Sequence, residues 1–191
     1  MAIVNEVQRL SRPVRRWART QEREYTNGEE RPLAGDLGAM GVYLGVVSAA
    51  AAAVRASGRE LPERIPFGDA LLLTVGTFRL VRRIAKDPVT SPLRAPFTRF
   101  QGASGHAEVA EEVRVHGGAR HAVGELLTCP FCLAQWVGTG FVFGYITAPR
   151  ATRLAALTMT MVAGSDVLQF AYDAIQNGGL PENTEGIDEG E

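Results

Sequence analysis

The chain has 191 residues, of which 46% are hydrophobic and 21% charged, and its net charge is -1. A charge balance so close to zero gives no basic field for nucleic acid, so we expect no nucleic-acid partner. The two cysteines lie three positions apart, which excludes the disulfide framework of a small secreted domain. The apolar residues form long runs with charges between them, and this grouping is typical of a membrane protein.

Residues 1–36 form a polar segment with seven arginines. Val7, Leu10, Val14 and Trp17 recur at spacings of three and four, which indicates either a basic amphipathic helix on anionic lipid or a solvated, partly helical tail. No apolar core of signal-peptide length is visible, so insertion is expected to depend on the first internal apolar run.

Four apolar runs are predicted to span the membrane. The first, residues 37–54, has 18 residues without a charge, or about 27 Å of helix, which matches the hydrocarbon thickness. Its Gly41 and Gly45 have the GxxxG spacing that lets helices approach closely in lipid. The second, residues 65–81, is the weakest in composition because Asp69 and Arg79 lie near its ends, where both can reach the headgroups.

The third and fourth runs are residues 131–148 and 154–172. The third again has 18 uncharged residues, with Gly140 and Gly144 at GxxxG spacing, and the fourth is interrupted by Asp166 alone. The last segment, residues 176–191, is acidic and Gly-rich without Lys or Arg, so we expect it to be disordered.

A polar stretch, residues 82–128, separates the second and third runs. Pro88, Pro92 and Pro96 exclude a continuous helix there, and glycines flank a short piece, residues 106–115, that resembles a helix. We expect a loop that is ordered only in parts. The predicted fold class is therefore an all-α integral membrane four-helix bundle, with a membrane domain over residues 37–175, this loop between its second and third helices, and disordered tails.

The number of Lys and Arg residues in each connection predicts the orientation. The N-terminal segment has seven and residues 82–120 have seven more, whereas the other two connections have three and two. This asymmetry places the N-terminus, the central loop and the C-terminus on the cytoplasmic side of the cell membrane.

That topology brings several polar residues to the inner ends of the spans. An acid inside a membrane is a candidate functional residue and needs a partner, and we expect Arg79 to pair with Asp166. The pair either takes part in chemistry or locks the bundle. The residues expected at this depth are Arg79, Cys129, Cys132, Asp166 and Gln169.

The Cys129-Pro-Phe-Cys132 step leaves three interpretations open. In a redox pair at a helix start, Cys129 would attack, Cys132 would resolve, and Asp166 or Glu125 would handle protons. In a metal site, the two thiolates and His121 would bind zinc or iron, although a closed tetrahedral site needs a fourth ligand. In a structural role, Pro130 would start the helix and the cysteines would pack as small apolar side chains.

Several stretches together carry a family resemblance: Phe78 to Asp87, Thr90, Pro92, Leu93, Arg94, Pro96, Glu125 to Cys132, Trp136, Gly164 to Asp166, and Tyr172. The chain resembles, over about residues 37–175, the uncharacterised bacterial membrane proteins called domain of unknown function 1360. Gln135 departs from the pattern, because a small residue is expected before Trp136. The resemblance implies an integral protein of the bacterial inner membrane and brings no activity.

The predicted function is that of a non-enzymatic membrane component with a structural or partner-binding role. Its partners would be the lipid bilayer and a second copy or another membrane protein, through the Gly/Ala helix faces. The alternative is a membrane thiol-disulfide oxidoreductase or a metal-binding protein that uses Cys129 and Cys132. A zinc or iron cofactor is expected only under that alternative. No nucleotide-binding or nucleophile motif indicates another kind of enzyme.

Overall fold

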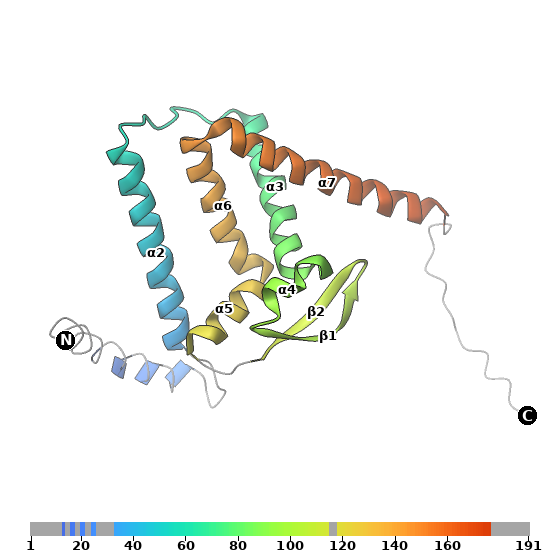
Figure 1. The fold of residues 1–191 in the computed structure, drawn as a ribbon, viewed down its shortest axis with the longest axis horizontal. Coiled ribbons are helices and arrows are strands. Elements are labelled where there is room, and N and C mark those ends of the chain that lie inside the picture. The colour runs from blue at the N-terminus through green and yellow to red at the C-terminus, as the bar shows by residue number, and fades with distance from the viewer. Residues whose placement is uncertain are drawn as a thin grey trace, which may run out of the picture.

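The computed structural model describes residues 13, 16–17, 20–21, 24–25, 33–114 and 118–176. Three helices stand side by side: α2 (Leu33–Ala56), α3 (Phe67–Lys86) and α6 (Pro130–Thr147). The fourth long helix, α7 (Pro149–Gln176), starts beside the end of α6 and runs obliquely away from the other three (Figure 1). The predictions for residues 1–32 and for the acidic tail from residue 177 lie almost wholly outside the described residues.

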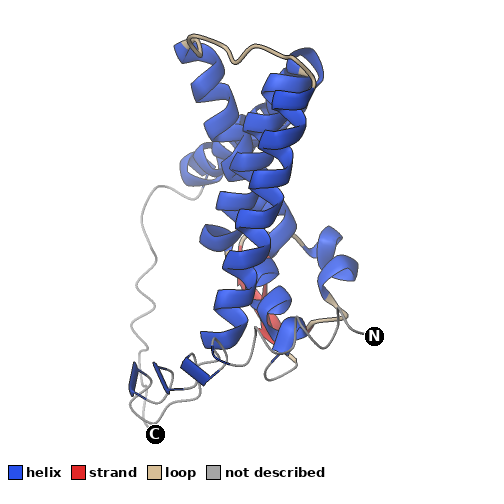
Figure 2. Cartoon of the chain, turned by 90° about the vertical axis from the view of Figure 1, so that its left-hand side faces the viewer, coloured by secondary structure: helices blue, strands red, loops and turns tan. Residues whose placement is uncertain are grey.

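Short elements gather at the C-terminal end of α3, and Figure 2 shows the two strands at the lower end of the upright helices. A 3-10 turn, η1 (Pro88–Thr90), leads into α4 (Ser91–Arg94). The strands β1 (Thr98–Gly105) and β2 (Glu108–Val113) pair antiparallel, and α5 (Gly118–Thr128) precedes α6. We call residues 88–113 the hairpin module.

The hairpin module corrects two predictions. The piece expected to be helical over residues 106–115 is not helical in its described part, 106–114, because Glu108–Val113 is a strand that pairs with β1. The fold is therefore mostly helical with a small sheet, and not all-α. The register shift between Phe100 and Gly102 marks a bulge, where Gly102 takes a φ of 142°, a conformation that side-chain-bearing residues rarely adopt. The stretch expected to be a partly ordered loop is a folded unit over its described residues.

The described helices include two that are long and apolar enough to cross a membrane, α2 from Gly35 to Ala56 and α7. A third is obtained if α5 and α6, which meet at an angle of 84°, count as one bent span. The second predicted run does form the helix α3, but α3 does not reach the same apolarity because it carries five charged residues: Asp69, Arg79, Arg82, Arg83 and Lys86. The structure thus gives two or three candidate spans where the sequence predicted four.

Helix α3 lies at the centre of the packing. Two clusters bury its apolar face: Leu73 with Phe141 and Ala156, and Val81 and Ala85 with Leu133. Gly76 sits where α3 crosses α7, and a Cβ there would lie 3.0 Å from the Cα of Ala156. The close crossing therefore depends on glycine at this position.

Helix α2 lies at the margin of the fold. Val54 is its buried hydrophobic residue, and the side chains of Met40, Val42, Leu44 and Val46 are more than half exposed. A polar contact, which we call the latch, joins α2 to α6. The Tyr43 hydroxyl lies 2.8 Å from Thr139 Oγ1 and accepts a hydrogen bond from Gln135 Nε2 at 2.6 Å. The Gln135 that departs from the family pattern thus has a local role in this chain.

Candidate functional site at the C-terminal end of helix α3

Three arginines on α3, which we call the arginine ridge (Arg79, Arg82 and Arg83), each face an acid. Arg79 Nε lies 2.9 Å from Asp166 Oδ2 on α7, as the sequence predicted, although its N–H is not aimed at the carboxylate well enough for a hydrogen bond. The pairing is confirmed, and its role in catalysis stays a prediction.

The second pair holds the hairpin module on α3, and the third lies at the residue that precedes the module. Arg82 donates from Nε and Nη2 to the two carboxylate oxygens of Glu108 on β2, at 2.8 and 2.5 Å. Arg83 Nε lies 3.4 Å from Oδ2 of Asp87, which in turn accepts from the backbone N–H of Val89 and starts η1. Because a forked guanidinium matches a carboxylate in two bonds, the Arg82–Glu108 pair fixes orientation as well as distance.

A buried ion pair forms the centre of the hairpin module. The Arg94 side chain has no exposed area, that of Glu111 is 6% exposed, and Arg94 Nε and Nη2 donate to the two Glu111 oxygens at 2.8 and 2.9 Å. Thr98 and Ser91 add hydrogen bonds to the same carboxylate. A charge that is fully removed from water persists only when such partners satisfy it.

The same guanidinium completes the end of α3. Arg94 Nη1 donates to the carbonyl of Ile84 at 2.5 Å, and Nη2 donates to the carbonyl of Asp87 at 3.1 Å. Thr90 Oγ1 donates to the carbonyl of Arg83 at 2.6 Å. The last carbonyls of a helix have no partners inside the helix, so these bonds replace the water that would otherwise satisfy them.

The network also sets the protonation state of Glu111. Burial raises the pKa of this carboxyl, but the hydrogen bonds from Arg94, Thr98 and Ser91 and the Arg94 charge outweigh it, so the pKa lies below its ordinary value of 4.5. Glu111 is therefore ionised at neutral pH, and the pair acts as a charged lock.

The cysteine step lies at the bend between α5 and α6. Cys129 is the N-cap of α6, its Sγ accepts from the N–H of Cys132 at 3.3 Å, and Pro130 is the first helical residue. Both thiols are free, and Cys132 is exposed. Pro130 thus starts the helix as the structural interpretation expected, whereas the exposed Cys132 does not pack as a buried apolar side chain. Nothing in this geometry tests the redox interpretation.

The described residues contain no group of three or more His, Cys, Asp and Glu side chains that is arranged to hold a metal ion. His121 lies 3.3 Å from Oε1 of Glu125, on the same face of α5. A site made of Cys129, Cys132 and His121 is therefore not formed in this conformation, and metal binding stays a prediction.

The five polar residues expected at one depth do not form one cluster. Leu133, next to Cys132, packs on Val81 and Ala85, which lie two and six residues beyond Arg79 on α3. Gln169 donates to Ser165 on its own helix. The structure thus joins Arg79 to Asp166 and leaves the cysteines nearer the end of α3.

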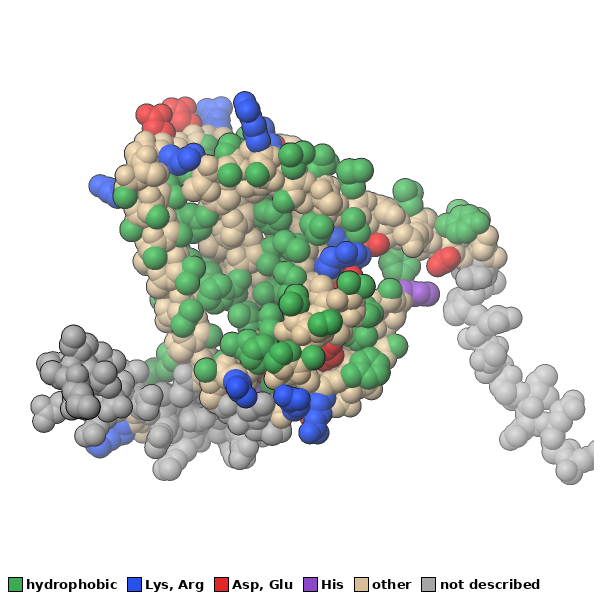
Figure 3. All heavy atoms as spheres, in the orientation of Figure 1, with side chains coloured by type: hydrophobic (Ala, Val, Ile, Leu, Met, Phe, Trp, Pro, Cys, Tyr) green, Lys and Arg blue, Asp and Glu red, His purple; other side chains and the backbone are tan. Residues whose placement is uncertain are grey.

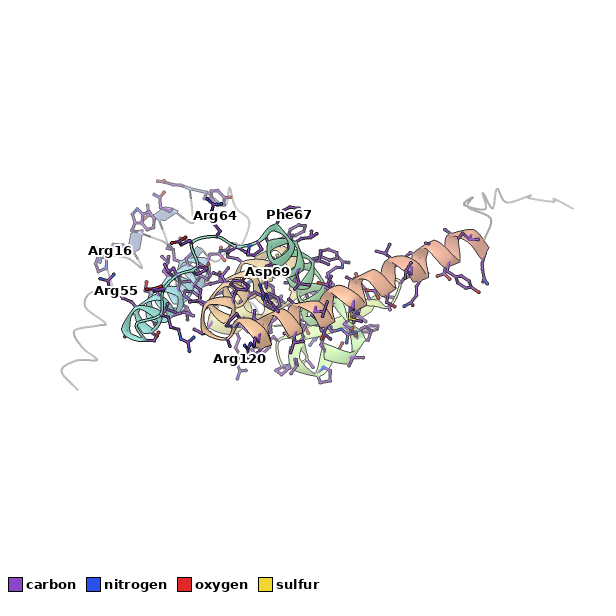
Figure 4. All side chains as sticks on the ribbon, turned by 90° about the horizontal axis from the view of Figure 1, so that it is seen from above. Arg16, Arg55, Arg64, Phe67, Asp69 and Arg120 are labelled. Atoms are coloured by element: carbon purple, nitrogen blue, oxygen red, sulfur yellow. The ribbon has the colours of Figure 1, made fainter. Side chains whose placement is uncertain are left out.

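A second polar cluster, which sequence reasoning missed, closes the opposite end of the bundle. Asp69 on α3 accepts a hydrogen bond from the Tyr145 hydroxyl at 2.5 Å and pairs with Arg153 of α7. Arg153 also lies over the Tyr145 ring, 5.6 Å from its centroid. Figure 4, seen from above, shows Asp69 where α3, α6 and α7 meet. The sequence held no signal for this cluster, because Asp69 lies 76 residues from Tyr145 and 84 residues from Arg153.

Fold and site together define a mostly helical, membrane-associated protein with a hairpin module locked onto its central helix by arginines. The chain belongs to the family of proteins of unknown function DUF1360, whose sequence model matches residues 72–172. The match begins inside α3, so α2 lies outside it, whereas the resemblance seen in the sequence was expected to start at residue 37.

A curated relative is similar over about half of the chain. The sporulation protein YjcA of Bacillus subtilis is 26% identical over 102 residues, which are 52% of this chain and 86% of the relative. No solved structure matches the chain.

Proposed function

We propose that this protein is a multi-pass protein of the bacterial inner membrane that holds a folded docking platform on its cytoplasmic side. The observation that carries this proposal is the attachment of the hairpin module to α3 by Arg82–Glu108 and by the buried Arg94. A loose connection needs no such lock, whereas a surface that must be presented in one orientation does. The name of the Bacillus relative states a cellular process and no reaction, so it adds no catalytic role.

The proposal includes α3 as a fourth span. Its Arg79 pairs with Asp166 of α7 and its Asp69 with Arg153, so neighbouring helices meet these charges. A helix at the centre of a bundle needs less apolar surface than one that faces lipid, because other helices cover it. With four spans, the counts of Lys and Arg place both ends and the module in the cytoplasm.

Cysteine labelling tests the orientation. In a Cys129→Ser/Cys132→Ser background, Glu60→Cys lies in the exposed α2–α3 connection and Ala95→Cys is exposed in the module. A membrane-impermeant maleimide should modify Glu60→Cys in intact cells and Ala95→Cys only after lysis. The reverse pattern would overturn the orientation.

Photo-crosslinking tests the platform. A photoreactive residue in place of Phe100, which is 69% exposed on β1, should give a discrete protein adduct in cells. The same residue in place of Leu61, which is 66% exposed in the α2–α3 connection at the opposite end, is the matched control and should give none. If both positions stay without adduct across growth conditions, the docking role is wrong.

We further propose that α2 pairs with a second copy of the chain. A Cβ placed on Gly38, Gly41 or Gly45 would have no atom within 4 Å, and helical spacing puts these glycines opposite the face that carries Tyr43. In the cysteine-free background, Ala52→Cys on that outward face should form an interchain disulfide, and Ala50→Cys on the inward side should not. Equal crosslinking at the two positions would contradict a specific interface.

The second candidate function is thiol-disulfide exchange. It is favoured by two free thiols at the start of α6, one of them exposed. Differential alkylation under oxidising and reducing conditions is the test. If both thiols remain equally alkylated in native membranes under either condition, redox exchange through this pair is ruled out.

A further inference from the structure

The described surface around the end of α3 combines cations without acidic partners and exposed apolar side chains. Lys86 and Arg120 make no ion pair with any residue that the structure describes. Val89 is 80% exposed, Leu93 65% and Phe131 90%. We call these five residues the interfacial collar.

Several acids at the same level have polar partners. Asp87 contacts Arg83 and caps η1, and Glu125 contacts His121. On the hairpin, Glu108 and Glu111 are held by Arg82 and Arg94, and Glu112 accepts from Gln101. Three acids at this end are not matched by a fixed cation: Glu112 bonds the neutral Gln101 amide, Glu125 contacts an imidazole, and Asp36 makes no ion pair with a described residue. Four cations without an ion pair to a described residue stand against them, Lys86, Arg99, Arg114 and Arg120, so the described residues leave a small positive excess.

Packing puts the collar residues at one depth. Lys86 is the last residue of α3 and Phe131 the second of α6, and the cluster of Ala85 with Leu133 joins these two ends. Val89 and Leu93 follow α3 directly, in η1 and α4. They cannot lie far from the level at which α3 ends.

Helix α5 adds Arg120 at this depth. It meets α6 at 84°, and its Ala122 Cβ would lie 3.8 Å from a Cβ on Gly35 of α2, so α5 runs across the end of the bundle. Figure 1 shows α5 between the lower ends of α2 and α6. A helix across the ends of membrane spans lies along the membrane surface. Figure 3 shows the same division, with apolar side chains over the middle of the visible face and most charged ones at its upper and lower ends.

We propose that the interfacial collar binds the anionic headgroups of the inner leaflet, with Lys86 and Arg120 on the phosphates and Val89, Leu93 and Phe131 in the acyl boundary. Cations next to exposed aliphatic and aromatic side chains are the composition that such an interface favours. An acidic protein would match the cations but would leave no reason for apolar side chains at bilayer depth. This inference rests on the proposed function, because it needs the module on the cytoplasmic side.

Spin-labelled lipids measure the binding directly. The full chain is reconstituted in phosphatidylcholine, and electron paramagnetic resonance gives the motionally restricted fraction of spin-labelled phosphatidylglycerol against spin-labelled phosphatidylcholine. We expect phosphatidylglycerol to be preferred at low salt, and Lys86→Gln/Arg120→Gln to lower its association constant by up to about fivefold per cation. Salt should weaken the preference in the unsubstituted chain.

Two further variants separate the outcomes. Arg55→Gln/Arg59→Gln removes the same charge from the opposite end and should keep the preference, and Val89→Ser/Leu93→Ser should speed hydrogen exchange of residues 87–95 in bilayers. Equal restriction of both lipids by the unsubstituted chain overturns the collar and leaves the proposed function standing. Loss of preference in the Arg55→Gln/Arg59→Gln variant alone would place the headgroup site at the opposite end and would also overturn the collar, while the cysteine labelling tests the orientation separately. Exchange in residues 87–95 that slows only with an added polyglutamate peptide would assign the surface to an acidic partner and would also overturn the collar.

Discussion

Helices α2 and α3 show opposite relations between sequence and packing. Helix α2 has the composition of a membrane span, yet only 6% of its apolar stretch is buried against the rest of the fold. Helix α3 carries five charged residues and does not qualify as a span by composition, yet it buries Leu73, Gly76, Val81 and Ala85 and contacts both α6 and α7. Hydropathy measures what a helix offers to lipid, and it says little about what other helices already cover.

The largest expected effect follows from Arg94→Ala on the α3 side of the comparison. The change leaves the Glu111 carboxylate buried without its cation and frees the carbonyls at the end of α3, so the module should lose about 3–5 kcal/mol of free energy of unfolding. Hydrogen exchange of β1 and β2 should become fast while α2 is unaffected. Arg99→Ala, at an exposed position on β1, is the control and should change little. Unchanged exchange in Arg94→Ala would refute the role of the lock.

Acid should open the same lock by protonation. The folded-state pKa of Glu111 is lowered from 4.5, so its contribution to stability is fully present above pH 4.5 and is lost as the pH falls through the lowered value. Hydrogen exchange of the hairpin measured from about pH 6 to about pH 3, corrected for the intrinsic rate, should show this loss. Glu111→Gln should remove that pH dependence, and an identical profile in both proteins would contradict it.

A matched pair of glycines tests the packing difference directly. Gly76→Ala puts a methyl group 3.0 Å from the backbone of Ala156 and should cost about 1–3 kcal/mol of free energy of unfolding in detergent. Gly45→Ala meets no atom of the same chain within 4 Å and should cost nothing in detergent at a dilution that keeps the chain monomeric. The midpoints of thermal unfolding of the two variants are compared. Equal midpoints would show that α3 does not cross α7 as closely as described.

The smallest effect is expected at the latch between α2 and α6. Tyr43→Phe removes a hydroxyl that bonds Gln135 and Thr139, and hydrogen bonds between membrane helices contribute about 0.6 kcal/mol on average. A double-mutant cycle with Gln135→Ala should give a coupling of that size. Additive single effects would indicate that the latch does not hold α2 in place.

The helices over the first, third and fourth apolar runs could be predicted because long uncharged runs are a local property of the sequence. The Arg79–Asp166 pair could also be predicted, since one acid and one base lay in facing runs at similar depth and a buried charge needs a partner. The sequence carried the resemblance to the DUF1360 family, and the family match confirms it.

The hairpin was missed because its signal was ambiguous. Residues 106–115 hold glutamates and valines that suit a short helix as well as a strand, and the pairing with β1 depends on residues up to 15 positions away. Glu108 and Glu111 form their ion pairs only when strand β2 places them against Arg82 and Arg94.

The sequence by itself determined that the long apolar runs form helices, that Asp166 inside one of them needs a basic partner, and that Pro130 begins a helix. The tertiary structure decided that α3 is the central helix, that the stretch after it is a locked module, and that Asp69, Tyr145 and Arg153 close the other end. The physical reason is range: hydropathy and helix starts are set by neighbouring residues, whereas a buried charge is stabilised by partners that only folding brings near.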